Sequence, residues 1–382
     1  MSFEARKYLN PEASTIVEEG CVLDVVRELP QPLILIDKAV SENPSVRELL
    51  DNKGAAGIVF FQCDEHLKSI ADYAQNCSII PDLPYESVVV IGSGVLLNFA
   101  YYFLADKYQQ QLQDGTLKVV VAPTNTMAIA DVAIGSLGLM NDNFQKNAVR
   151  KYCDPDIVLL DKALFMASPL SQQADGCVEV LKHALMQDEG AIEQAARAFL
   201  RLEKNPETLY RLAHQGLQQK SLIQDVFLTT ERKDTSILLS YGHLVAHAIE
   251  EQSGFAVPHS SAVFVGLLCD LLLMGHEEMA QKLMQLAQGS ALQETINHAV
   301  TVALQCDLDA LTPQKHKFRD GNNFRVVALS KLGQFSDLEA PIAFKIVTPQ
   351  EYADAIQQVA EGLAPASLES NHAAAHRPQN KA

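Results

Sequence analysis

The chain has 382 residues, a usual length for two domains, and 48% of them are apolar, which suits large buried cores rather than a disordered chain. Its formal net charge of −17 argues against the backbone of a nucleic acid or an anionic membrane surface as the main partner. The first residues lack the apolar core of a signal peptide, no apolar run could span a bilayer, and the seven cysteines form no CxxC pair, so we expect a reduced, cytoplasmic chain.

Five short apolar runs in the first half of the chain predict buried strands. Each is bounded by Gly, Pro, Asp or Asn, and they occupy residues 33–36, 57–61, 88–91, 118–121 and 157–160. Helical patterns lie between them, for example over 64–76 and 95–112. Continuous apolar strands that alternate with helices are typical of a doubly wound parallel sheet. We therefore expect residues 1–160 to form an α/β, Rossmann-like domain.

Helical patterns dominate after residue 160. They cover 169–187, 189–202, 206–228, 236–252, 260–273, 277–288 and 291–305. Two apolar runs, 324–329 and 343–347, then predict a small hairpin, and a last helix is expected at 349–363. The pattern predicts a mainly α-helical second domain over 161–363. The Ala-, Ser-, His- and Pro-rich residues 364–382 are expected to be a disordered tail.

Histidines gather in the segment 240–266. His243 and His247 are four residues apart and share one face of a predicted helix, and His259 comes just before the next helix. Glu179, in an earlier predicted helix, is the best candidate for a third metal ligand. Imidazole and carboxylate together suit zinc or another first-row divalent ion, and three protein ligands leave positions open for substrate oxygens. Two histidines on one helix are also often only a polar face, so spacing alone leaves both interpretations open.

Two segments of the first domain have the residue types of a cofactor site. The turn formed by Gly92, Ser93 and Gly94 joins a predicted strand to a helix, where glycines let the backbone approach a pyrophosphate and the helix N-terminus favours an anion. Thr124 and Asn125 follow another predicted strand and offer a hydroxyl and an amide. Both segments are equally compatible with ordinary structural turns.

Lys146 and Asn147 are adjacent in a polar segment between two predicted strands. A lysine beside an asparagine can bind a phosphate or a substrate hydroxyl. Such a pair is more often solvated surface, and the residues alone do not decide between the two hypotheses.

Taken in order, these segments resemble the dehydroquinate synthase superfamily, the sugar phosphate cyclases, over roughly residues 30–350. Val178–Lys182, Gly242–Glu250 and His259–Gly266 resemble the superfamily motifs AEVIK, GHTFGHAIE and HGEAVAxG. Gly92–Asn98 resembles the motif GGGVxxD. The resemblance implies an NAD-binding Rossmann-like domain followed by a helical domain that binds a metal.

The resemblance also implies roles for individual residues. As ligands of a divalent metal, zinc or cobalt, it implies Glu179, His243 and His259. As residues that contact NAD it implies Asp37, Glu65, Lys68, Gly92, Ser93, Gly94, Asn98, Thr124, Asn125 and Asp131. As catalytic or substrate-binding residues it implies Lys146, Asn147, Lys182 and His247.

The implied activity is the closure of a carbocycle from a sugar phosphate. NAD oxidises a secondary alcohol, the neighbouring C–H becomes acidic, phosphate is eliminated, and the ketone is reduced again before an intramolecular aldol step. The metal polarises oxygens, and histidine and lysine side chains move protons. The resemblance thus implies a carbon–oxygen lyase with a small sugar phosphate as substrate, without a nucleic-acid or membrane partner, and with the homodimeric state common among relatives.

Several positions differ from the superfamily pattern. A substrate-binding lysine is replaced by Leu137, a phosphate-binding arginine falls near Gly115, and an arginine and an asparagine fall at Ser236 and Ser240. Serine cannot replace a planar guanidinium. We therefore expect a substrate without the carboxylate of the shikimate-pathway substrate, and the basic cluster 315–317 is a candidate for compensating contacts.

Asn98 and Tyr241, by contrast, resemble 2-deoxy-scyllo-inosose synthase and favour a cyclase of specialised metabolism, such as cyclitol antibiotic biosynthesis. Two other hypotheses stay open. Iron-containing alcohol and glycerol dehydrogenases carry an Asp-x-x-x-His pair, whose spacing Glu179 and His183 share, and such an enzyme would accumulate NADH. A non-catalytic member of the superfamily would keep the fold without the activity.

Overall fold

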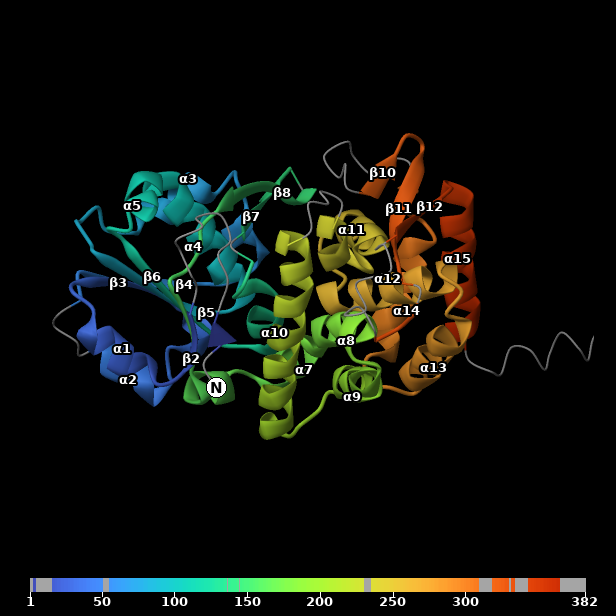
Figure 1. The fold of residues 1–382 in the computed structure, drawn as a ribbon, viewed down its shortest axis with the longest axis horizontal. Helices are drawn as coiled ribbons and strands as arrows, with labels where there is room; N and C mark the ends of the chain where they lie inside the picture. The colour runs from blue at the N-terminus through green and yellow to red at the C-terminus, as the bar shows by residue number, and fades with distance from the viewer. Residues whose placement is uncertain are drawn as a thin grey trace, which may run out of the picture. The chain divides into compact units, whose positions relative to one another are not determined.

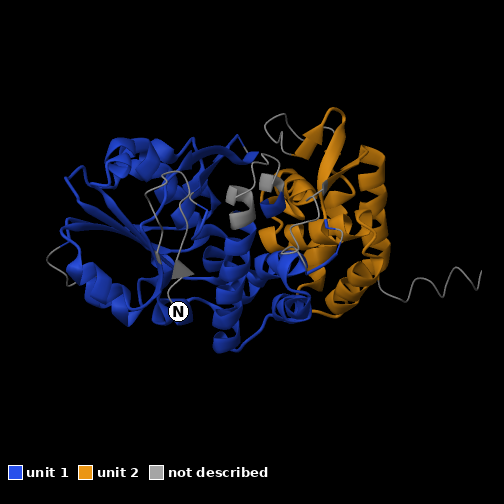
Figure 2. Cartoon of the chain, viewed as in Figure 1, with its two compact units in different colours: residues 1–239, 329–342 blue, residues 240–328, 343–382 orange. Residues whose placement is uncertain are grey.

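The computed structural model describes residues 3–4, 16–50, 55–135, 137–143, 145–229, 235–308, 318–329, 331–333 and 343–364. The chain divides into two compact units (Figure 2): residues 1–239 with 329–342 form unit 1, and residues 240–328 with 343–382 form unit 2. The predicted change from sheet to helices after residue 160 falls inside unit 1. The predicted tail lies outside the described residues except for Ala364. Within the described ranges, no helix has both the length and the apolar character needed to cross a membrane.

Unit 1 contains a seven-stranded sheet with the strand order β1-β2-β9-β6-β5-β3-β4. Its strands are β1 (Phe3–Glu4), β2 (Ile16–Glu19), β3 (Pro32–Asp37), β4 (Gly57–Phe61), β5 (Ser87–Gly92), β6 (Lys118–Pro123) and β9 (Ile157–Leu160). Neighbouring strands are parallel except for β1 and β2. All five predicted strands are present, and the predicted Rossmann-like sheet is confirmed.

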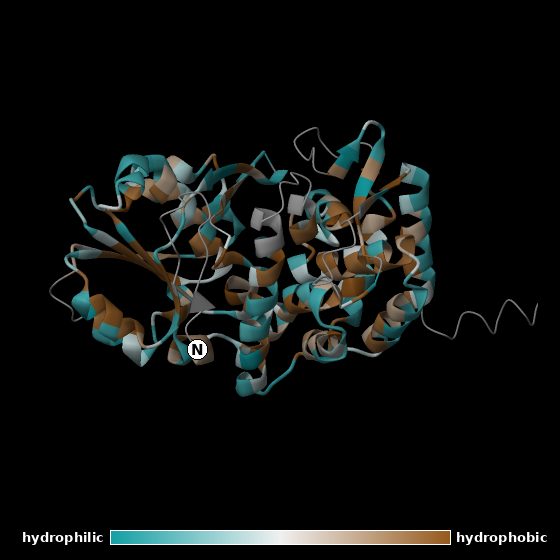
Figure 3. Cartoon of the chain, viewed as in Figure 1, coloured by the Kyte–Doolittle hydropathy of each residue, from teal (hydrophilic) through white to brown (hydrophobic). Residues whose placement is uncertain are grey.

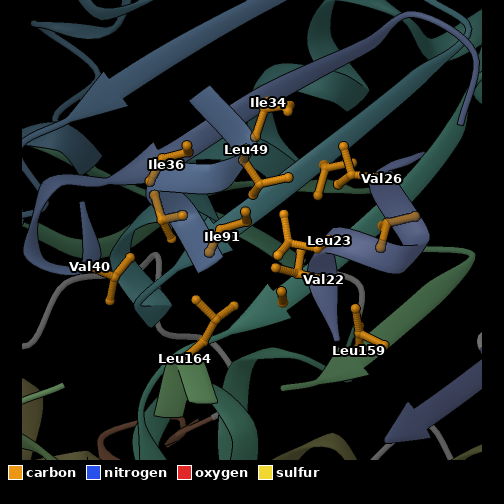
Figure 4. Packing of buried hydrophobic residues seen from close by; sticks show 14 residues of the cluster. Val22, Leu23, Val26, Ile34, Ile36, Val40, Leu49, Ile91, Leu159 and Leu164 are labelled. Atoms are coloured by element: carbon orange, nitrogen blue, oxygen red, sulfur yellow. The ribbon is translucent and has the colours of Figure 1, made fainter. Parts of the chain in front are cut away.

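Helices cover both faces of this sheet (Figure 1). On one face, α1 (Val22–Glu28) and α2 (Pro44–Leu50) pack against a cluster of buried aliphatic side chains (Figure 4). Because side chains alternate along a strand, Ile34 and Ile36 belong to this cluster while their neighbours face the other side. There, α4 (Gly94–Lys107) contacts β3, β5 and β6. The strands are hydrophobic almost throughout (Figure 3), as expected for a sheet buried on both faces.

The connections in this part of unit 1 differ from the prediction. The helix predicted over 64–76 consists of η2 (Glu65–Lys68) and α3 (Tyr73–Ser78), and the next predicted helix is split into α4 and α5 (Gln109–Gln113). A hairpin of β7 (Leu137–Asp142) and β8 (Gln145–Tyr152) was not predicted. A one-turn π-helix, η3 (Ala128–Val132), follows β6.

The remaining elements of unit 1 are mostly helical. They are α6 (Lys162–Ala167), α7 (Leu170–Asp175), α8 (Cys177–Gln187), α9 (Glu189–Leu200), α10 (Pro206–Thr229) and η4 (Thr235–Ser240). The single helix predicted over 169–187 is wrong, because it is interrupted at Gly176. A Cβ atom on Gly176 would lie 2.4 Å from the backbone nitrogen of Met127, so only glycine fits at this close approach between α7 and α8.

Unit 2 is mainly helical, as predicted. Its elements are α11 (His243–Gln252), α12 (His259–Leu273), α13 (Glu277–Ala287), α14 (Gln293–Ala303), β10 (Arg319–Asp320), β11 (Asn323–Ala328), β12 (Ala343–Val347) and α15 (Pro349–Leu363). The predicted hairpin is confirmed by the antiparallel pairing of β11 with β12. The helix α12 is buried along almost its whole length and contacts α11, α13, α14 and α15, so it is the core of this unit.

Candidate cofactor, metal and substrate sites

The carboxyl ends of β3 and β5 hold the first group of predicted cofactor residues. Asp37 ends β3, and its carboxylate accepts hydrogen bonds from the Ser93 hydroxyl at 2.8 Å and from the Ala39 backbone at 2.9 Å. Gly92 ends β5, where a Cβ atom would lie 2.9 Å from the Cβ of Asp37 and 2.8 Å from Leu96. Only glycine fits this position. Carboxyl ends of parallel strands are where doubly wound sheets bind nucleotides.

Thr124 and Asn125 form the neighbouring turn, at the end of β6. The Thr124 amide donates to the carbonyl of Gly92 at 3.0 Å, and the Asn125 side chain accepts from the Ala128 amide at 2.8 Å. Gln173 of α7 donates to the Thr124 carbonyl at 3.1 Å. These bonds make the segment a capped turn fastened to α7, and its contact with a cofactor stays a prediction.

Asn98 links α4 to the hairpin β7–β8. Its Oδ1 accepts from the Leu139 backbone at 3.1 Å, and its Nδ2 donates to the Gly94 carbonyl at 2.8 Å. An aspartate has no donor for the second bond. Leu137, where the superfamily has a lysine, is half-buried at the start of the same hairpin.

A partly buried polar cluster surrounds Glu65, and we call it the Glu65 cluster: Glu65, Lys68, Asn141, Lys146 and Asn147. The Glu65 carboxylate accepts from the Asn141 amide at 2.8 Å and lies 3.9 Å from the Lys68 ammonium and 3.8 Å from the Lys146 ammonium. Lys68 donates to the Asn147 side chain at 2.9 Å. Two ammonium groups on one carboxylate leave the cluster with a positive charge. It therefore suits a phosphate.

The predicted residues Glu65, Lys68, Lys146 and Asn147 are thus brought together, although the chain separates the two pairs widely. The side-chain oxygen of Asn141 completes the cluster by accepting a hydrogen bond from the backbone amide of Asn147 at 3.0 Å. It was not predicted, because one asparagine in a polar hairpin has no recognisable signal.

A second group, the Asp131 cluster, consists of Asp131, Glu179, Lys182, His183 and Lys220. Lys182 is completely buried, forms an ion pair with Glu179 and lies 3.4 Å from Asp131. The Lys220 ammonium lies 3.3 Å and the His183 Nε2 atom 3.9 Å from the same aspartate. Two carboxylates and two ammonium groups therefore balance one another in the interior of unit 1.

The pKa shifts in the Asp131 cluster follow from burial and from these pairs. Burial opposes ionisation of Asp131, but the ammonium groups of Lys182 and Lys220 outweigh it and lower the aspartate pKa. Burial lowers the pKa of Lys220, and the nearby aspartate only partly restores it. Burial, helped by the charge of Lys182, lowers the pKa of His183 to about 3. His183 is therefore neutral at physiological pH.

Lys220 is a site residue that the sequence did not reveal. It lies on the long amphipathic helix α10, where lysines usually mark the exposed face. Its neighbours Gln219 and Gln224 are also buried. A buried polar patch of this kind becomes visible only when the packing of the helix is known.

The histidines of unit 2 form a compact group. The ring centroids of His243 and His259 are 5.5 Å apart, and those of His243 and His247 are 5.6 Å apart. His243 Nδ1 contacts the Tyr241 carbonyl and His259 Nδ1 contacts the buried Glu250 carboxylate, each at 2.9 Å. An acceptor at Nδ1 places the proton there and makes Nε2 the ligand nitrogen, the usual arrangement of metal-binding histidines.

Glu179, the third predicted ligand, belongs to unit 1, where it is completely buried in the Asp131 cluster. One carboxylate and two imidazoles are a donor set that zinc, cobalt or iron accepts. The residues therefore fit a divalent metal, and their binding of one common ion stays a prediction. The basic cluster 315–317 lies outside the described residues.

Two family profiles match the sequence. The profile of the 3-dehydroquinate synthase N-terminal domain matches residues 60–174, and that of the 3-dehydroquinate synthase C-terminal domain matches residues 176–317. Together they cover more than half of the chain. The chain therefore belongs to the dehydroquinate synthase superfamily, the sugar phosphate cyclases.

Curated relatives agree with this assignment. The 3-dehydroquinate synthase of Sulfolobus acidocaldarius is 29% identical over 203 residues, which are 50% of this chain and 54% of the relative. That of Saccharolobus solfataricus is 25% identical, over 67% of this chain and 72% of the relative. The 2-deoxy-scyllo-inosose synthase of Streptomyces kanamyceticus is 27% identical, over 62% of this chain and 60% of the relative. The matches thus span between 54% and 72% of these relatives.

Solved structures share the fold. A 2-deoxy-scyllo-inosose synthase complexed with carbaglucose-6-phosphate, NAD⁺ and Co²⁺ has a TM-score of 0.68 at 18% identity, covering 94% of this chain and 99% of that one. A 2-epi-5-epi-valiolone synthase from Streptomyces hygroscopicus, with NAD⁺ and Zn²⁺ bound, has a TM-score of 0.64 at 17% identity. The match covers 93% of this chain and 99% of that one. An iron-containing alcohol dehydrogenase from Thermotoga maritima has a TM-score of 0.54 at 14% identity, and the match covers 90% of this chain and 97% of that one.

Proposed function

We propose that the chain is an NAD- and metal-dependent sugar phosphate cyclase, a carbon–oxygen lyase that eliminates phosphate while it closes a carbocycle. The observation that carries this proposal is the pair His243 and His259, each with an acceptor at Nδ1, in a chain of this superfamily. Ring nitrogens fixed in this way are prepared to bind a metal. The complexes of two solved neighbours, one with Co²⁺ and one with Zn²⁺, support a zinc or cobalt ion.

In this proposal Glu179, His243 and His259 hold the metal. A bound divalent ion supplies Lewis-acid polarisation of substrate oxygens, and a bound nicotinamide supplies reversible hydride transfer. Both of these solved neighbours also contain NAD⁺, which supports the same cofactor here. The residues proposed to hold it are Asp37, Glu65, Lys68, Gly92, Ser93, Gly94, Asn98, Thr124, Asn125 and Asp131.

The substrate contacts are assigned to two lysines, an asparagine and a histidine. Lys146 and Asn147, in the positively charged Glu65 cluster, would bind the phosphate. Lys182 and His247 are both buried and would hold and move protons at the reacting hydroxyl groups. Without a cation at position 137, a carboxylate on the substrate would lack a partner there. We therefore propose a sugar phosphate that carries no carboxylate, such as a hexose or heptulose phosphate.

We also propose the cellular setting of the enzyme. The seven cysteines, which form no CxxC pair, favour a cytoplasmic location. The similarity to a 2-deoxy-scyllo-inosose synthase of Streptomyces favours specialised metabolism, such as antibiotic biosynthesis. A homodimer is proposed from the resemblance to the superfamily alone.

A polyol or alcohol dehydrogenase is the second candidate. Glu179 and His183 are one turn apart on α8, both completely buried, and both within the Asp131 cluster. Their spacing is that of the metal-binding pair in iron-containing dehydrogenases, one of which shares this fold. A dehydrogenase would need no phosphate on its substrate and would accumulate NADH.

The experiment is an assay of phosphate release by purified protein supplied with NAD and Zn²⁺ or Co²⁺. Glucose 6-phosphate and sedoheptulose 7-phosphate are offered in turn, with glycerol as the dehydrogenase substrate. We expect phosphate release from one of the sugar phosphates and none after removal of the metal with a chelator. Turnover of glycerol alone would contradict the proposal and favour the dehydrogenase.

A further inference from the structure

The helix that carries His243 begins without a cap of its own. Gly242 is the N-cap residue of α11, and it has no side chain to accept hydrogen bonds from the first turn. Its φ of 74° lies in the left-handed region, which glycine adopts without strain. A Cβ atom at Gly266 of α12 would lie 1.8 Å from the Gly242 carbonyl oxygen. The start of α11 therefore rests directly on the backbone of α12.

Two side chains from other helices serve this helix start. Asp270, one turn beyond Gly266 on α12, accepts a hydrogen bond from the Gly242 amide at 2.8 Å. Tyr352 of α15 donates its hydroxyl hydrogen to the other carboxylate oxygen of Asp270 at 2.9 Å. Asp270 thus satisfies the Gly242 backbone donor at the start of α11, and Tyr352 holds the carboxyl group that does so.

The same pair fixes His243 relative to His259. His259 is the first residue of α12, and Asp270 lies three turns further along the same helix. Asp270 binds the residue directly before His243, so both histidines take their positions from one rigid element. Asp270 and Tyr352 are 2% and 0% exposed, and a carboxyl group at such a place is tolerated only because both of its oxygens accept hydrogen bonds.

We propose that Asp270 and Tyr352 are positioning residues that hold His243 in place for metal binding, so that the last helix, α15, sets the metal affinity. This inference rests on the proposed metal site. Outer hydrogen-bond partners of metal ligands commonly change metal affinity 10- to 100-fold when they are removed. The link to α15 is made by one tyrosine hydroxyl, so the role can be tested by removing a single oxygen atom.

The test compares Tyr352→Phe, Asp270→Ala and Asp270→Asn with the wild-type chain. Co²⁺ is titrated into metal-depleted protein, its visible absorption band reports the ligand geometry, and chelator competition gives the dissociation constant. Tyr73→Phe is the matched control, because Tyr73 also donates to an aspartate, Asp106, at 3.0 Å, but in unit 1. Thermal unfolding of the metal-depleted variants measures the purely structural effect.

We expect Tyr352→Phe to weaken Co²⁺ binding about 10-fold and Asp270→Ala by about 10- to 100-fold, with a changed absorption band. Asp270→Asn keeps an acceptor for the Gly242 amide. Its dissociation constant for Co²⁺ should therefore stay within about three-fold of the wild-type value. Tyr73→Phe should lower the unfolding temperature without weakening Co²⁺ binding.

Two results would overturn the inference, and they differ from each other. Unchanged Co²⁺ affinity and absorption in Tyr352→Phe would show that the tyrosine and aspartate only stabilise the fold, while the proposed metal site would stand. If the wild-type chain itself bound no Co²⁺, the metal site and the positioning role would both be rejected. Tyr352→Phe removes only the hydroxyl group and keeps the packed ring, so the test remains valid even if Asp270→Ala does not fold.

Discussion

Lys182 illustrates how a buried side chain is kept ready for chemistry. Its ammonium group has no exposure to water, which opposes its charge, but the carboxylates of Asp131 and Glu179 outweigh the burial and raise its pKa. Lysines buried without such partners lose their proton instead. The charge of Lys182 therefore depends on two residues that are themselves predicted to contact cofactor and metal.

Replacing Glu179 tests the metal assignment at the residue scale. Glu179→Ala should weaken binding of Zn²⁺ or Co²⁺ by more than about 100-fold, because changes to outer partners alone cost 10- to 100-fold. Binding of NAD should stay within about two-fold, measured by fluorescence titration. Glu193→Ala on the neighbouring helix α9 is the control, since Glu193 forms a half-exposed ion pair with Arg197 on the same helix. Full metal binding by Glu179→Ala would reject the assignment.

Lys220 provides a second residue-scale prediction. Lys220→Met keeps most of the buried side-chain volume but removes one of the two ammonium groups beside Asp131, so we expect the KM for the sugar phosphate to rise about 10-fold. Lys162→Met, which removes an exposed lysine paired with Glu207, is the matched control. Equal KM values for the two variants would place Lys220 outside the substrate site.

At the scale of elements, the parallel strands could be predicted because each is a continuous apolar run with turn residues at both ends. The hairpin β7–β8 could not, since its residues are mixed polar and apolar and its place depends on α4. Likewise, the need for glycine at position 176, between α7 and α8, comes from the close approach of Met127, which no local pattern contains. Sequence periodicity reports which face is buried, and such contacts depend on what packs against that face.

The residues of the candidate site also divide into those that the sequence predicts and those that it does not. His243, His247 and His259 stand out because their spacing is unusual and matches a superfamily motif. Three residues were missed. Lys220 and Asn141 lie in segments where polar residues are normally exposed, and Asp270 lies on a helix whose sequence is almost uniformly apolar. A buried polar residue is recognised only once its burial is known.

The packing of β7 on α4 gives an element-scale prediction. A Cβ atom at Gly138 would lie 2.1 Å from the Tyr102 backbone nitrogen, so Gly138→Ala must displace the hairpin. Overpacking of this kind costs about 1–3 kcal/mol or more. We expect a lower unfolding temperature and weaker substrate binding, because Lys146 and Asn147 lie on β8. Gly190→Ala in α9 is the control, and a Gly138→Ala chain as stable and active as wild type would contradict the described packing.

At the scale of the whole molecule, Asp270 should make stability depend on pH. Burial raises its pKa to about 7 from the ordinary value of 3.8, and the groups that face it, Tyr352 and Tyr241, carry no charge. Between these two pH values the unfolded chain binds fewer protons than the folded chain, so stability falls as the pH rises. Above about pH 7 both states are ionised and this dependence ends.

Asp270→Asn removes that titration. Relative to wild type, the variant should therefore gain unfolding temperature as the pH is raised from 5 to 7.5, in thermal scans of metal-depleted protein. Asp106→Asn is the control: burial opposes ionisation of Asp106, but Lys151 and Lys107 outweigh it and lower its pKa, so its effect should be constant over this range. A constant difference for Asp270→Asn as well would mean that Asp270 is ionised throughout.

A sugar phosphate cyclase completes a redox cycle in which NAD is regenerated. The most direct measurement follows released phosphate and NADH absorbance together, over many turnovers of a sugar phosphate with NAD and Co²⁺ present. We expect many equivalents of phosphate per enzyme, with NADH never exceeding the enzyme concentration. NADH that accumulates in step with substrate consumption, with no phosphate released, would contradict it and identify the chain as a dehydrogenase.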